Sequence, residues 1–151
     1  MMSKATNQFS ALILTIFKTN GMILAWGDQF VAPFGLTSAR WQMLGALALS
    51  KEPLAAPRIA DSMGVTRQGA QKQLNLLLKE GLIERLPNPL NLRSPVYQLT
   101  SLGHEHYQSI DKQWQKHVRF ITQQLNAQDL HIANQVLTNI AALHSPISSG
   151  D

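Results

Sequence analysis

The chain has 151 residues, the size of one domain or of one compact unit with appended helices. Hydrophobic residues make up 44% and charged residues 15%, which excludes a disordered, solvated chain. Cysteine is absent, so disulfides, cysteine nucleophiles, cysteine zinc sites and thiol redox switches are excluded. The formal net charge of +4 favours a polyanionic partner.

A first helix is predicted from about Asn7 to Val31, and Pro33 and Gly35 end it. Its run from Ala11 to Phe17 loosely resembles the apolar region of a signal peptide. The apolar spacing fits one face of an amphipathic helix better, at Phe9, Leu12, Ile13, Ile16 and Phe17. Since no run reaches the 18 apolar residues of a membrane span, we expect a soluble cytoplasmic protein.

Three shorter helices follow. One begins at Thr37 or Ser38, whose hydroxyl can cap it, and it ends before a turn at Ser50–Pro53. Its apolar stripe is Trp41, Leu44, Leu47 and Ala48. The next helix follows Pro57 and turns Ile59 and Met63 inward. Gly64 can end it in the left-handed conformation, and Thr66 can cap a further helix that runs from about Thr66 to Glu80.

Two strands are predicted next, at Leu82–Leu86 and Val96–Leu99. Three prolines in the segment Pro87–Pro95 forbid regular ladder pairing there. We therefore expect a hairpin with a long, stiffened tip.

Two C-terminal helices are predicted, the first beginning at Thr100 or Ser101, before a frayed tail from Pro146 to Asp151. The first carries a coiled-coil-like seam of Tyr107, Ile110, Trp114, Val118, Ile121 and Leu125. The second carries a stripe of Leu130, Ala133, Val136 or Leu137, Ile140 and Leu143. These faces exceed what one small domain can cover, so we expect a homodimer.

The order of elements predicts a mainly α fold with a small β-hairpin wing. A winged helix-turn-helix at residues 37–100 is flanked by an N-terminal dimerisation helix at 1–36 and C-terminal dimerisation helices at 101–151, all in one structural unit. The dimer contacts are expected from Phe9, Ile13, Tyr107, Ile110, Trp114, Val118, Ile121, Leu137 and Ile140.

The predicted helix from Thr66 to Glu80 has two kinds of face. Ala70, Leu74 and Leu77 suit packing, whereas the opposite arc is rich in hydrogen-bond donors and lacks acids before Glu80. Arginine matches guanine O6 and N7, and glutamine matches adenine N6 and N7, so we predict DNA reading over a merely solvated face. The expected DNA contacts are Arg58, Thr66, Arg67, Gln68, Gln71, Lys72, Asn75, Arg93 and Ser94.

Positive charge is concentrated in the same region. From Leu54 to Thr100 six basic residues against three acidic ones give +3 of the total +4. At the wing tip, Arg93 suits a narrow minor groove, whose walls strengthen the negative potential. Taken alone, a solvated loop arginine is an equally good interpretation.

Several segments together resemble the MarR family of bacterial transcription regulators. The wing and the residues after it, from Asn88-Pro89 through Arg93-Ser94 to Leu99-Thr100-Ser101-Leu102-Gly103, resemble the family's Asp-x-Arg wing followed by Leu-Thr-x-x-Gly. The other segments are Leu36-Thr37-Ser38-Ala39-Arg40-Trp41, Pro57-Arg58-Ile59-Ala60, Gly64-Val65-Thr66-Arg67-Gln68-Gly69 and Gly81-Leu82-Ile83-Glu84-Arg85. The resemblance covers about Leu36 to Gly103.

The wing departs from the family pattern at two positions. Asn91 stands where the family usually has an Asp that holds the recognition helix or orients the wing arginine, and Leu92 stands where a second arginine is common. The resemblance implies a homodimer formed by the first, fifth and sixth helices and binding to a palindromic operator. It also implies release, in many members, by a small ligand bound between the dimer helices and the DNA-binding part.

Rival functions find less support. His104 and His106 point about 200° apart on a helix, and the sequence has no His-x-x-x-His pair, glycine-rich phosphate loop or paired carboxylate cluster. We therefore predict no enzyme, cofactor or metal site. A metal-responsive regulator would need His104, Glu105 and His106 to meet a residue of another helix or subunit. A winged helix used only for protein interaction would generally lack the donor-rich face.

Four aromatic residues gather near the end of the first helix and the start of the second: Trp26, Phe30, Phe34 and Trp41. They form either an apolar pocket for an aromatic ligand or plain core between the dimer helices and the DNA-binding domain.

Overall fold

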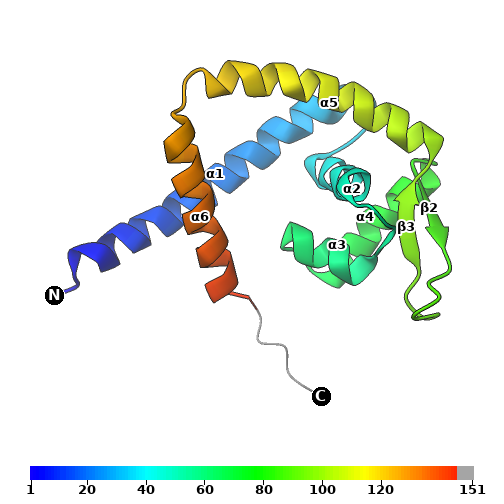
Figure 1. Ribbon diagram of the computed structural model, residues 1–151, viewed down its shortest axis with the longest axis horizontal. Coiled ribbons are helices and arrows are strands. Elements are labelled where there is room, and N and C mark those ends of the chain that lie inside the picture. The colour runs from blue at the N-terminus through cyan, green and yellow to red at the C-terminus, as the bar shows by residue number, and fades with distance from the viewer. Residues whose placement is uncertain (146–151) are drawn as a thin grey trace. The chain divides into compact units, whose positions relative to one another are not determined.

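The computed structural model describes residues 1–145, so the predicted frayed tail from Pro146 to Asp151 lies outside the described residues. Contacts divide the chain into two compact units, Met1–Ile110 and a second that begins at Asp111. Along the chain the elements are α1 Lys4–Val31, the 3-10 turn η1 Ala32–Phe34, α2 Ser38–Leu49, β1 Leu54–Ala55, α3 Ala56–Met63, α4 Arg67–Lys79, β2 Ile83–Leu86, β3 Val96–Leu99, α5 Ser101–Thr122 and α6 Ala127–Leu143 (Figure 1).

Side-chain caps set the helix boundaries. The hydroxyl of Ser3 accepts from the backbone N–H of Thr6 at 3.1 Å, so α1 begins three residues before the predicted Asn7. The hydroxyl of Thr37, one of the two predicted candidates, caps α2, and the hydroxyl of Thr66 caps α4 as predicted. Gly64 ends α3 in the left-handed conformation, with φ of 66°, which confirms the predicted turn of the helix-turn-helix.

The sheet has three strands in the order β1-β3-β2, all antiparallel. The predicted hairpin of β2 and β3 is confirmed, although β2 begins at Ile83 rather than Leu82. The prediction missed β1, in which Leu54 pairs with Tyr97 of β3. Two residues directly before a helix are too few to show a strand periodicity. The loop between β2 and β3 extends beyond the sheet, as the prolines predicted (Figure 1).

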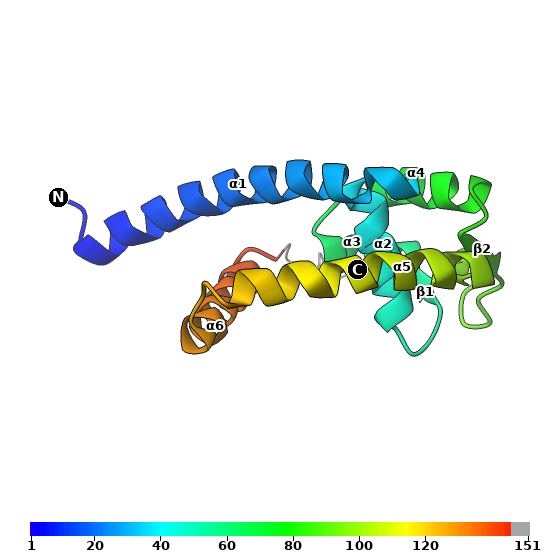
Figure 2. The ribbon, with the colours of Figure 1, turned by 90° about the horizontal axis from the view of Figure 1, so that it is seen from above.

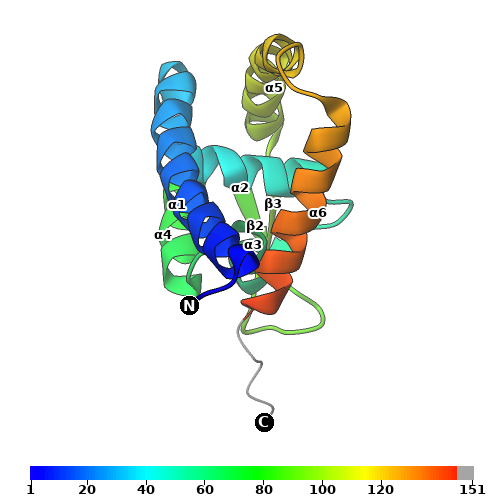
Figure 3. The same ribbon diagram turned by 90° about the vertical axis from the view of Figure 1, so that its left-hand side faces the viewer.

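A single apolar core holds the first unit together, and α2 packs against both α1 and β3 (Figure 3). Its largest fully buried side chains are Tyr97, Met43, Leu44, Ile59, Leu74, Leu77, Ile110 and Val31. Tyr97 and Leu99 face inward, in agreement with the predicted alternation along β3. The sequence did not single out Met43 as core.

Ile110 corrects one predicted dimer contact. Its side chain is fully buried within its own chain, so it has no surface left for a partner. Periodicity identifies an apolar face but does not say whether the same chain or a second one covers it. The boundary between the two compact units falls after Ile110, within α5.

The start of α5 is tied to the start of β2. The hydroxyl of Thr100 donates to the carbonyl of Gly81 at 2.6 Å and accepts from the N–H of Gly103 at 3.1 Å. The N–H of Thr100 donates to the carbonyl of Leu82. A Cβ at Gly103 would overlap that same carbonyl oxygen, so only glycine allows this close approach.

The first helix, α1, is long and continuous (Figure 2), and Gly27 and Val31 are the only residues of Lys4–Val31 that are buried. Among its apolar side chains, Leu14 is 70% and Phe17 69% exposed. An 18-residue window within Lys4–Phe34 has a mean hydropathy of 1.4, so by length and composition this helix could cross a membrane. The length of the longest uninterrupted apolar run did not indicate a possible membrane span. Scattered polar residues interrupt that run but lower the mean hydropathy of the helix only slightly.

The last helix, α6, likewise lies on the surface. None of the residues from Ala127 to Leu143 is buried, and Ile132, Val136 and Leu137 are between 40% and 48% exposed. Leu125, the predicted end of the α5 seam, lies in the turn after that helix and is half exposed.

Replacing Gly103 with alanine should lower the free energy of unfolding by about 1–3 kcal/mol, because the new methyl group overlaps the Leu82 carbonyl. Gly45→Ala is the matched control, since its Cβ would meet Tyr107 at an ordinary 3.8 Å. Denaturant unfolding of both variants at one protein concentration would measure the difference. Equal stability of the two variants would contradict the packing described for α5.

Candidate nucleic-acid interface

The helix-turn-helix consists of α3 and α4. The hydroxyl of Thr66 accepts from the N–H of Gly69 at 3.0 Å and caps α4, which has no acidic residue in its first turn. The remaining N–H groups of that turn and the exposed Arg67 give this end of α4 a positive character. An anion such as a DNA phosphate is favoured there.

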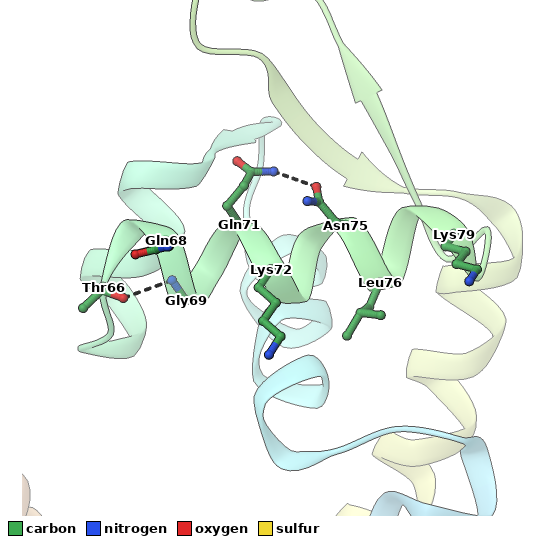
Figure 4. Close-up of a pocket in the computed structure, with 8 residues that line it drawn as sticks. All are labelled: Thr66, Gln68, Gly69, Gln71, Lys72, Asn75, Leu76 and Lys79. Atoms are coloured by element: carbon green, nitrogen blue, oxygen red, sulfur yellow. Dashed lines mark hydrogen bonds between the residues drawn. The ribbon is translucent and has the colours of Figure 1, made fainter.

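The predicted division of α4 into two faces is confirmed. Ala70, Leu74 and Leu77 are buried against the core. The opposite side lines a groove of about 840 Å³ with Thr66, Gln68, Gly69, Gln71, Lys72, Asn75, Leu76 and Lys79 (Figure 4). The sequence prediction did not include Leu76 in this face. Its exposed side chain offers an apolar contact suited to a thymine methyl group.

Gln71 is held by its neighbours. Its Nε2 donates to Asn75 Oδ1 at 2.9 Å and to the hydroxyl of Tyr97 at 3.2 Å (Figure 4 shows the first of these). Asn75 lies one turn further along α4, and Tyr97 belongs to β3. The sequence predicted Gln71 as a base contact but gave no sign of these partners, because Tyr97 is 26 residues away.

A second groove, of about 340 Å³, lies between the start of α4 and the wing. Its lining residues are Ala56, Pro57, Arg67, Gln68, Gln71, Arg93, Ser94, Pro95 and Tyr97. The structure thus brings the predicted wing residues Arg93 and Ser94 together with the predicted helix residues Arg67, Gln68 and Gln71. Tyr97 joins them without having been predicted.

The wing tip is organised by two asparagine side chains. Asn88 Oδ1 accepts from the N–H of Leu90, and its Nδ2 donates to the carbonyl of Ser94 at 3.0 Å. Asn91 Oδ1 accepts from the N–H of Arg93 at 3.1 Å. Such turns fix the backbone on both sides of Arg93, whose side chain is exposed.

Arg58 is exposed on α3 and lies 3.7 Å from Glu52. Both side chains are about 70% exposed, so this ion pair adds little to stability and a phosphate can replace the carboxylate.

Sequence reasoning missed Arg40 as a positioning residue of α4. This half-buried side chain of α2 lies 4.0 Å from Glu80, donates to Gln73 Oε1 at 3.3 Å and donates to the carbonyl of Gly35 at 3.4 Å. It therefore joins the end of α4 to the turn that follows α1. The signal available in the sequence was that Arg40 is the only charged residue of this helix.

The four predicted aromatic residues are partly brought together. The rings of Trp26 and Phe30 stack at 4.8 Å, and Phe30 lies 5.3 Å from Trp41. Phe30, Phe34 and Trp41 pack against the core of the first unit. Ring contacts of this kind favour the interpretation as core where α1 meets α2.

The histidines named for a metal site lie on α5. His106 Nδ1 contacts the carbonyl of Leu102 at 3.1 Å. Within residues 1–145, no group of three or more His, Cys, Asp or Glu side chains lies close enough to hold a metal ion.

Comparison with known proteins agrees with this geometry. A model of the MarR family matches residues 34–94. An uncharacterized protein of Mycobacterium tuberculosis, Rv2011c, is 35% identical over 105 residues, which are 70% of this chain and 72% of that protein. The chain belongs to the MarR family. This MarR-family protein is therefore a winged-helix DNA-binding transcription regulator, and its family and fold are not those of enzymes, as predicted.

Two solved structures illustrate the fold. A mutant of MarR from E. coli complexed with operator DNA has a TM-score of 0.75 and 20% identity, over 91% of this chain and 99% of that chain. CouR from Rhodococcus jostii RHA1, bound to p-coumaroyl-CoA, has a TM-score of 0.76 and 18% identity, over 98% of this chain and all of that chain.

Proposed function

We propose that this MarR-family protein is a cytoplasmic, homodimeric repressor that binds a specific, palindromic double-stranded DNA operator and is released by a small ligand. The observation that carries the proposal is the composition of α4. The polar side chains on its outward face are all uncharged or basic, and Glu80 at its end lies toward Arg40. Because this face and Arg93 border one groove, helix and wing can contact the same stretch of DNA.

The homodimer is supported by apolar surface that the chain leaves uncovered. Phe9 and Phe17 of α1 and Leu137 of α6 are all more than 40% exposed, and the predicted contacts Ile13, Trp114, Val118, Ile121 and Ile140 are half-buried. Exposed apolar area of this extent is typical of an interface. A two-fold dimer presents two copies of α4, which suits half-sites one turn of DNA, about 34 Å, apart.

The proposals of repression and of ligand release are supported by structural relatives and by the cluster of Trp26, Phe30, Phe34 and Trp41. Operator DNA is present in the MarR structure, and CouR holds p-coumaroyl-CoA. In this chain Phe30, Phe34 and Trp41 pack against the core, whereas Trp26, stacked on Phe30, is 37% exposed and offers such a ligand an apolar surface where α1 meets α2. Arg40 connects that junction to α4 through Gln73 and Glu80, so a ligand there can alter the orientation of α4.

Replacing Arg67 or Gln68 with alanine should remove a base contact and cost about 1–3 kcal/mol per half-site on the preferred sequence. Discrimination should flatten at one base position per half-site. Titration of the selected operator and of scrambled DNA would measure both effects, with Arg119→Ala on α5 as the control. If both α4 variants keep the wild-type ratio of specific to scrambled affinity, α4 is not the reading element.

Arg93→Ala should weaken binding to all sequences by a similar factor, because the wing arginine acts mainly on the charge of the DNA. The slope of log affinity against log salt should fall by about one unit per wing. Arg93→Lys retains the charge and should retain the slope. A slope that is the same for alanine and wild type would place Arg93 away from the phosphates.

Dimerisation should make stability depend on protein concentration, because the exposed apolar faces are covered only in the dimer. Trp114→Asp should disrupt the dimer, since it places an unpaired charge in the interface. Ser109→Asp, on the opposite side of α5, is the control. Sedimentation velocity and thermal unfolding at several concentrations would measure both. A monomeric mass with a concentration-independent melting temperature would rule out the homodimer.

A further inference from the structure

Tyr97 is the largest fully buried side chain of the described residues, and it lies on the central strand of the sheet. It pairs with Leu54 of β1 on one side and with Arg85 of β2 on the other. Its backbone is thereby fixed, and the residue is 99% hidden from solvent. Its hydroxyl nevertheless reaches α4, where it accepts from Gln71 Nε2 at 3.2 Å.

The hydrogen bonds of Gln71 use all of its donor capacity. A glutamine amide has two N–H protons and one carbonyl oxygen. One proton of Gln71 is directed to Tyr97 and the other to Asn75, at 3.2 and 2.9 Å. Only the carbonyl Oε1 is left to contact a base.

This arrangement changes what Gln71 can recognise. A freely rotating glutamine donates to adenine N7 and accepts from adenine N6 together. An amide that can only accept matches any base with an amino group in the major groove, which means adenine N6 or cytosine N4. It is repelled by guanine O6 and thymine O4, which are acceptors themselves.

We propose that Tyr97 is a specificity-determining positioning residue, which holds the amide of Gln71 so that Gln71 accepts adenine or cytosine and rejects guanine and thymine. The inference rests on the proposed DNA-reading function of α4. It replaces the adenine preference that the residue type of Gln71 alone predicts. Tyr97 acts through Gln71 and lies at the wing side of the groove that Arg67 and Arg93 also line.

The experiment compares the operator preferences of wild type, Tyr97→Phe and Gln71→Ala by selection of bound DNA from random sequence. The position read by Gln71 is the one whose preference disappears in Gln71→Ala. At that position wild type should enrich adenine and cytosine within about twofold of each other. Tyr97→Phe frees one N–H of Gln71, so the adenine-to-cytosine ratio should rise at least about fivefold. Other positions serve as the internal control.

The double variant Tyr97→Phe with Gln71→Ala should show the same preferences as Gln71→Ala alone. A merely structural role of Tyr97 would instead lower affinity at all positions equally. Gln71→Glu tests the inference without touching the core, because a carboxylate also only accepts. It should retain the preference for adenine and cytosine, with a weaker overall affinity.

The outcomes separate the two claims. If wild type enriches no sequence, the proposed function fails and the inference fails with it. If wild type enriches a site but favours adenine over cytosine tenfold at the Gln71 position, the inference alone is overturned. An unchanged ratio in a folded Tyr97→Phe protein, or loss of the cytosine preference in Gln71→Glu, also overturns it.

Discussion

The burial of Ala70, Leu74 and Leu77 determines which side of α4 faces the solvent, and the DNA-binding surface depends on it. Burying such side chains contributes about 1.5–3 kcal/mol for each leucine, so α4 cannot rotate without a large cost. Arg40 secures the same orientation from α2 through Gln73 and Glu80. The outward position of Gln68 and Lys72 follows from packing on the other side of the helix.

The same balance between burial and exposure accounts for the long helices. Val31 and Ile110 are fully buried in the first unit, whereas most of α1 and all of α6 lack a covered face. The apolar side chains of α1 give this helix the length and hydropathy of one that could cross a membrane. In the proposed homodimer a second copy of the chain covers these faces, and two recognition helices contact one DNA duplex.

The features that the sequence predicted are those determined over a few residues. The caps at Thr37 and Thr66 and the left-handed Gly64 depend on neighbours within four positions, and the structure confirms them. Contacts between residues far apart in the sequence could not be predicted. The periodicity of apolar residues identifies which face of a helix or strand is apolar, but not which element packs against that face. Ile110 was therefore assigned to the wrong interface, and the bond from Tyr97 to Gln71 was missed.

The wing shows how a changed motif can retain its physical role. Asn91 replaces the acidic residue that is usual in the family, yet its Oδ1 still accepts from the N–H of Arg93, a bond that needs an acceptor and no charge. Leu92 replaces a common second arginine, so the loop loses one acid and one base together. The net charge of the loop is +1, the same as it would be with an Asp at position 91 and an Arg at position 92. The long-range attraction of the loop to DNA is therefore preserved. Without an acidic side chain at position 91, no carboxylate there can form an ion pair with the guanidinium of Arg93 that DNA binding would have to break.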